Sequence, residues 1–108
     1  EKYPAAALTA VGTNSAATLA MRKAGATRAA TGENAVVVAC RTADVIVGPV
    51  GIAVADALMG EVTPRMAEAV GSSRARRVLI PVNACETIIV GVEETGIATL
   101  VRKAVELL

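Results

Sequence analysis

One short run, Ala43-Asp44-Val45-Ile46-Val47-Gly48-Pro49-Val50-Gly51, constrains the fold more than any other part of the chain. Its centre is three consecutive β-branched residues, which leave no polar side to face water. We therefore predict a strand that is buried on both sides. A Gly-Pro pair ends this strand, and a second glycine keeps the following turn open before a new apolar segment begins. A buried strand, a tight turn and then a helix form half of a βαβ unit.

The length and composition predict one domain, residues 1–108, with a core of small aliphatic side chains. A chain of 108 residues is one domain and is long enough to bury a core. Apolar residues make up 54% of it and aromatic residues only 1%. Such side chains suit helices that pack closely on a sheet.

The charge pattern excludes several classes of partner. The net charge is +1, from 11 basic and 10 acidic residues, so no polyanion is indicated. Tyr3 is the only aromatic residue, and single-stranded nucleic acid needs aromatic stacking platforms. The chain has no histidine, which excludes His-based catalytic triads and His metal sites. We predict neither a nucleic-acid partner nor a metal site.

The cysteines and the apolar stretches indicate the compartment. Cys40 and Cys85 lie far apart in sequence, without metal-ligand spacing, and we expect both to pack as small hydrophobic residues. Two thiols in a chain that shows no signal peptide predict a reducing cytoplasm. The longest apolar stretch, 45–55, is too short to cross a bilayer, so we expect no membrane partner.

Strand-like and helix-like segments alternate along the chain. The expected strands are 5–11, 26–30, 45–47, 77–82 and 87–92. The expected helices are 16–24, 35–41, 52–59, 64–70 and 97–108. Segment 35–41 carries three consecutive valines, which favour a strand, but a crossover is needed before the strand at 45–47, so we choose a helix. Alternation of this kind predicts an α/β fold with a mainly parallel sheet and helices on both of its faces.

Several helix ends have recognisable capping residues. Either Thr13 or Asn14 suits the N-cap of the first helix, and Gly25 suits its C′ position. Thr63 and the proline after it suit the start of the fourth helix, and Thr95 suits the start of the last.

The loops that follow the strands predict a binding site. In a parallel sheet, ligands bind at the carboxyl ends of the strands, and helix N-termini there suit anions. We expect a small anionic molecule, with a nucleotide or dinucleotide as a candidate cofactor. Each loop taken alone also fits an ordinary capped turn. The candidate ligand-binding residues are Gly12, Thr13, Asn14, Ser15, Thr31, Gly32, Glu33, Asn34, Gly48, Pro49, Gly51 and Asn83.

Two further features have two interpretations each. Ser72-Ser73-Arg74-Ala75-Arg76-Arg77 combines hydroxyl and guanidinium groups and suits a phosphate clamp, although a solvated loop is the commoner outcome. Glu33 suits a ribose hydroxyl, and it equally suits the first turn of a helix, where acidic residues are favoured by the helix dipole.

A series of short motifs resembles a bacterial family of unknown function, made of small Rossmann-like proteins. The motifs are Gly12-Thr13-Asn14, Lys23-Ala24-Gly25-Ala26, Ala30-Thr31-Gly32-Glu33-Asn34, Gly48-Pro49-Val50-Gly51-Ile52, Gly60-Glu61-Val62-Thr63-Pro64, Met66-Ala67-Glu68-Ala69 and Ile80-Pro81-Val82-Asn83. The resemblance spans nearly the whole chain and implies a three-layer Rossmann-like sandwich. Members also carry an N-terminal strand and helix joined by a Gly-rich loop. This chain begins after that unit, so the loop's phosphate-binding role carries over to no residue here.

Three functions fit these observations. The first is a Rossmann-like module that binds a nucleotide or another small anion. The second is an enzyme of the dehydrogenase type, completed by the N-terminal Gly-rich unit; the absence of histidine and of a Tyr-x-x-x-Lys pair counts against it. The third is a structural protein that assembles with itself. Without the N-terminal unit the strand at 45–47 would have an open edge, so we expect either a homo-oligomer or a longer natural protein.

Overall fold

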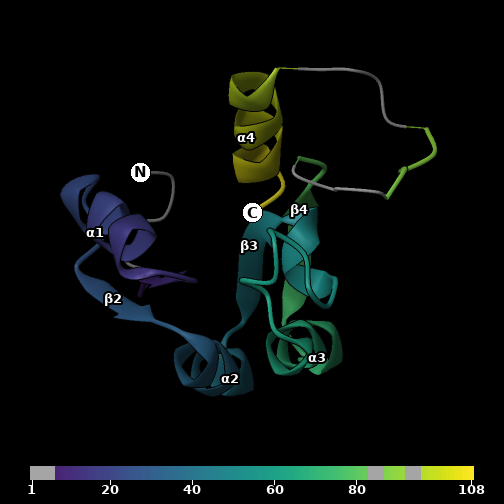
Figure 1. Ribbon diagram of the computed structural model, residues 1–108. Helices are drawn as coiled ribbons and strands as arrows, with labels where there is room; N and C mark the ends of the chain where they lie inside the picture. Colours follow the sequence, from purple (N-terminus) through teal and green to yellow (C-terminus); the bar gives the residue numbers. More distant parts are fainter. Residues whose placement is uncertain (1–6, 83–86, 92–95) are drawn as a thin grey trace.

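The computed structural model describes residues 7–82, 87–91 and 96–108 (Figure 1). Short strands alternate with helices, which confirms the predicted mixed α/β class. Asn83 and Thr95 lie outside the described residues. In chain order the elements are β1 (Thr9–Gly12), α1 (Ser15–Lys23), β2 (Arg28–Thr31), α2 (Glu33–Thr42), β3 (Val45–Pro49), the 3₁₀ helix η1 (Val50–Ala53), α3 (Pro64–Ser72), β4 (Arg76–Ile80) and α4 (Ile97–Glu106).

The described strands form two separate parallel pairs. β1 pairs with β2, with Ala10 opposite Ala29, and β3 pairs with β4, with Val47 opposite Val78. Figure 1 shows the two pairs set apart, with α2 leading from one to the other. The parallel pairing agrees with the sequence prediction, whereas the strands described here do not form one continuous sheet.

Both ends of α1 follow the prediction from sequence. Asn14 is the N-cap, because its Oδ1 accepts a hydrogen bond of 2.8 Å from the N–H of Ala17, which decides between Thr13 and Asn14. Gly25 follows the helix with φ of 120°, and its N–H and that of the next residue donate to carbonyls of the last turn, both at 3.1 Å. This is the Schellman arrangement that a glycine at C′ permits.

The starts of α2 and α3 use different caps. The segment at 35–41 is helical, as we chose, and lies within α2. Its N-cap is Gly32, with φ of 100° and no side-chain hydrogen bond. Thr63 caps α3 as predicted, since its Oγ1 accepts from the N–H of Met66 at 3.2 Å, and Pro64 follows at the first helical position.

The prediction of a helix at 52–59 is wrong. The chain makes only the single 3₁₀ turn of η1 there and then a series of turns. Asp56, Leu58 and Met59 have φ of 64°, 56° and 57°, a left-handed conformation that no right-handed helix contains. The segment instead closes on itself, as the N–H of Asp56 donates to the carbonyl of Val62 at 2.7 Å.

Two predictions about strands are also wrong. Residues 87–91 form no strand, and Ile88 and Val90 are 90% and 94% exposed. No strand in the described ranges pairs with them, and β-branched residues alone do not form a strand without a partner. Val92 lies outside the described residues. β3 is not buried on both sides, since Val45 and Val47 are 43% and 47% exposed. Only β4 pairs with β3 among the described strands, so the described part of the chain leaves one edge of β3 unpaired.

The remaining element boundaries differ less. β1 begins at Thr9 rather than at position 5, and residues 1–6 lie outside the described residues. α4 begins at Ile97 with Gly96 as its N-cap. No helix in the described ranges is long and apolar enough to cross a membrane.

The core cluster lies where α2 and α3 meet the turns that precede α3. Ala57, Val62, Met66 and Ala67 are buried together there, and Val62 is 1% exposed. Val36 of α2 packs against this cluster. The core therefore fixes the segment at 60–63 against α2. This segment lies beside residues 31–34, the loop from which α2 begins.

Candidate functional site

The structure brings together two of the predicted loops, residues 12–15 and 31–34. The N–H of Gly32 donates to the carbonyl of Gly12 at 3.0 Å. Just inside α1, the hydroxyl of Thr18 lies 2.6 Å from that of Thr31 and donates to the carbonyl of Ala30 at 3.3 Å. The carboxyl ends of β1 and β2 are thus joined by hydrogen bonds, as neighbouring parallel strands predict.

A third segment, residues 60–63, completes this cluster. The side-chain amide of Asn14 donates to Oε1 of Glu61 at 2.7 Å, and the hydroxyl of Thr63 donates to Oε1 of Glu33 at 2.6 Å. We call the three segments 12–15, 31–34 and 60–63 the loop junction. Sequence reasoning missed Glu61, because the local sequence signals the cap at Thr63 but gives no sign of a contact with Asn14.

The loop junction holds two carboxylates and no basic side chain from its own segments. Each carboxylate accepts one hydrogen bond from a neighbouring segment, through Oε1. Thr13 is half-buried, whereas Ser15 and Asn34 are exposed. Negative charge beside the loops opposes a bare anion in contact with both carboxylates and favours a ligand that also donates hydrogen bonds.

The third predicted loop belongs to the other strand pair. Gly48 and Pro49 end β3, and Gly51 is buried in η1, which packs against α3. No hydrogen bond in the described part of the chain joins residues 48–51 to the loop junction. A Cβ on Gly48 would lie 2.8 Å from Cδ1 of Ile52, so the glycine lets the Ile52 side chain pack directly against the end of β3.

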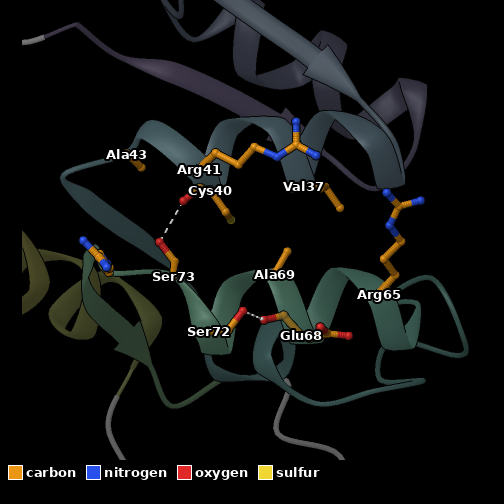
Figure 2. Close-up of a pocket in the computed structure, with 10 residues that line it drawn as sticks. Val37, Cys40, Arg41, Ala43, Arg65, Glu68, Ala69, Ser72 and Ser73 are labelled. Carbon is orange, nitrogen blue, oxygen red and sulfur yellow. Dashed lines mark hydrogen bonds between the residues drawn. The ribbon is translucent and has the colours of Figure 1, made fainter.

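A separate groove, with a volume of about 550 Å³, runs between α2 and α3 (Figure 2). None of the predicted loop residues lines it. It is lined by Val37, Cys40, Arg41, Ala43, Arg65, Glu68, Ala69, Ser72, Ser73 and Arg74.

A family model described as a domain of unknown function, DUF3842, matches residues 1–108. The chain belongs to the DUF3842 family. This confirms the resemblance to a family of unknown function that the motifs indicated. No curated protein and no solved structure matches the chain.

In this DUF3842 protein the hydroxyls of the 72–77 segment are engaged within the fold. Ser72 donates to the carbonyl of Glu68 at 2.6 Å, and Ser73 donates to that of Cys40 at 2.8 Å (Figure 2). Arg77 donates through Nη1 to the carbonyl of Ser73 at 2.7 Å. The hydroxyls thus serve as turn and helix-end contacts, in line with the loop that was the commoner of the two interpretations, and Arg74 is the arginine of this segment that lines the groove.

Cys40 is a half-buried free thiol on the wall of the same groove. Burial raises the pKa of this thiol, because a thiolate loses solvation there. In this DUF3842 protein the Cys40 thiol is therefore more protonated at a given pH than a fully solvated cysteine, and its alkylation is slower. Across the described ranges, no three Cys, Asp or Glu side chains gather where they could hold a metal ion.

Proposed function

We propose that this DUF3842 protein is a small-molecule-binding module and that a nucleotide binds at the loop junction. The main support is a pair of side-chain hydrogen bonds that join the three segments, from Asn14 to Glu61 and from Thr63 to Glu33. These links hold the carboxyl ends of β1 and β2 in one arrangement before any ligand arrives. Such preorganisation lowers the entropic cost of binding.

The chemistry of the loop junction suits a ligand that has both hydrogen-bond donors, such as hydroxyl groups, and a phosphate group. Each of the two carboxylates uses Oε1 for a neighbouring segment, which leaves its second oxygen to accept from a ligand hydroxyl. Ribose supplies two adjacent hydroxyls. Helices α1 and α2 both start at these loops. The backbone N–H groups of a first helical turn have no partner within the helix, and they favour phosphate oxygens.

Calorimetry with AMP, ADP, ATP and NAD tests this proposal, after a thermal-shift screen with the same compounds. A ligand that binds the native state raises the unfolding temperature. Glu61→Gln should weaken binding about tenfold or more, since it weakens a charge-assisted acceptor. Glu106→Gln, at an exposed position on α4 away from the loop junction, is the matched control and should bind as the wild type does. Equal affinities of the two variants, or no binding of any nucleotide, would contradict the proposal.

A second candidate function, assembly through an open strand edge, is favoured by β3. The strand has the β-branched sequence of a buried strand, yet Val45 and Val47 are nearly half exposed. β1 and β3 each pair on one side only among the described strands. We propose that a second copy of the chain covers the edge of β3. A strand that paired with both β1 and β3 would also unite the two pairs into the single sheet of a three-layer, Rossmann-like sandwich.

A further inference from the structure

The groove between α2 and α3 gathers positive charge on one concave surface. Arg41 comes from the last turn of α2, Arg65 from the first turn of α3, and Arg74 from the turn before β4. Among the residues that the structure describes, Glu68 is the only acidic one that lines the groove. Figure 2 shows Arg41 extending along α2 toward Val37 and Arg65 reaching toward α2 from the opposite wall, so both guanidinium groups lie toward the same end.

These three arginines have no partner within the part of the chain that the structure describes. No hydrogen bond or ion pair engages their guanidinium groups, although Glu68 lies one turn after Arg65 on the same helix. The loop junction is arranged differently, since both of its carboxylates are already hydrogen-bonded. The groove therefore presents unsatisfied, permanently charged donors around a hollow.

We propose that this groove binds a small molecule that carries phosphate, independently of the loop junction. Guanidinium groups are planar, always charged and donate two parallel hydrogen bonds to phosphate oxygens, which makes arginine well suited to such ligands. A volume of about 550 Å³ lies in the range of sites for small molecules. Val37 on α2 and Ala69 on α3 add apolar surface to the two facing walls, and the Ser73 hydroxyl already donates to the carbonyl of Cys40, so the arginines carry the recognition.

The packing of α2 on α3 keeps the two walls of the groove in place. Ser73 ties the end of α3 to α2 through its 2.8 Å hydrogen bond to the carbonyl of Cys40. Met66 and Ala67, on the buried side of α3, hold that helix in the core cluster. Arg41 and Arg65 thus project from elements that are fixed relative to each other, which is what a preformed anion site needs.

Calorimetry with inorganic pyrophosphate at low ionic strength tests the proposal, because this probe has no ribose for the loop junction. A second calorimetric series with a hexose monophosphate measures whether a phosphate ester binds with an affinity similar to that of pyrophosphate. Arg41→Gln and Arg65→Gln should each weaken pyrophosphate binding about tenfold or more, since each removes charge-assisted hydrogen bonds. Arg102→Gln, an exposed position on α4, is the matched control and should change the affinity less than twofold.

Protection of Cys40 from alkylation in a Cys85→Ser chain gives a second readout inside the same groove. Pyrophosphate should slow the alkylation, and Arg65→Gln should abolish that protection. The proposal fails if pyrophosphate does not bind at millimolar concentration. It also fails if Arg41→Gln and Arg65→Gln bind as Arg102→Gln does. Glu61→Gln should leave pyrophosphate binding unchanged, so failure here is distinct from failure of nucleotide binding at the loop junction.

Discussion

Asn14 and Glu61 are 47 residues apart in sequence, yet the side-chain amide of Asn14 donates to the Glu61 carboxylate at 2.7 Å. The other end of the same amide accepts from the N–H of Ala17 and caps α1. One side chain thus performs a local and a long-range task. It couples the start of α1, next to β1, to the segment that precedes α3.

Asn14→Ala should lower the free energy of unfolding by about 1–2 kcal/mol, since it removes the cap and the link together. Asn14→Asp separates the two contributions. Aspartate caps as well as asparagine does, but its carboxylate cannot donate to Glu61 and repels it. Denaturant unfolding should therefore rank the stabilities as wild type, then Asn14→Asp, then Asn14→Ala. If Asn14→Asp is as stable as the wild type, the link to Glu61 contributes nothing.

Thr63 of the loop junction also makes two side-chain contacts. Its Oγ1 accepts from the N–H of Met66 and donates to Glu33. Thr63→Ala should cost about 1–2 kcal/mol of stability, because an N-cap is lost next to the core. Thr63→Ser keeps the hydroxyl and should restore most of that loss. Urea unfolding of the two variants provides the measurement, and a Ser variant no more stable than the Ala variant would show that the methyl group matters instead.

Gly12 has a steric role that differs from that of a glycine in open space. A Cβ at this position would lie 2.8 Å from the backbone nitrogen of Thr18, which cannot move aside without shifting α1. Gly12→Ala should therefore destabilise the protein by about 1–3 kcal/mol, as measured by urea unfolding. Gly71, within α3, is the matched control, because a Cβ there would meet nothing within 4 Å beyond its chain neighbours and the backbone of its own helix. Gly71→Ala should stabilise by up to about 1 kcal/mol, and equal effects of both changes would contradict this account.

The sequence predicted the features whose causes are local. The Asn14 cap, the left-handed Gly25 and the Thr63-Pro64 start each depend on residues within one turn, so short motifs suffice. The parallel pairing of β1 with β2 followed from the alternation of strands and helices.

Features that depend on distant partners were not predictable in this way. The segment at 52–59 has the apolar content of a buried helix, but its turns are closed by Val62, which lies beyond it in sequence. Glu61 belongs to the loop junction because of its hydrogen bond with Asn14, which lies 47 residues away in sequence and leaves no local signal. The arginines of the groove come from α2, α3 and the turn before β4, and no local pattern indicates that Arg41 and Arg65 line the same groove.

Cys40 should make the stability depend on alkaline pH. Burial raises the pKa of its thiol above the ordinary value of 9.0, so the folded state holds a proton that the unfolded state loses first. The stabilisation is therefore complete below pH 9 and is lost as the pH rises through the folded pKa. In a Cys85→Ser background, the stability of the Cys40 chain should fall more steeply above that pH than the stability of Cys40→Ala. Parallel pH profiles would show that the thiol has no such effect.

The open edge of β3 leads to a prediction about association. Exposed backbone donors and acceptors at a strand edge invite pairing with another chain, and the half-exposed side chains of Val45 and Val47 add apolar area to that pairing. Light scattering should therefore give a mass above 10.9 kDa that falls on dilution. Val47→Lys should shift the equilibrium toward the monomer, because a charge at a strand edge opposes pairing. Val54→Lys, a similarly exposed valine outside the strands, is the control and should leave the mass unchanged. A monomer at every concentration, or equal effects of both lysines, would mean that a second copy does not cover β3.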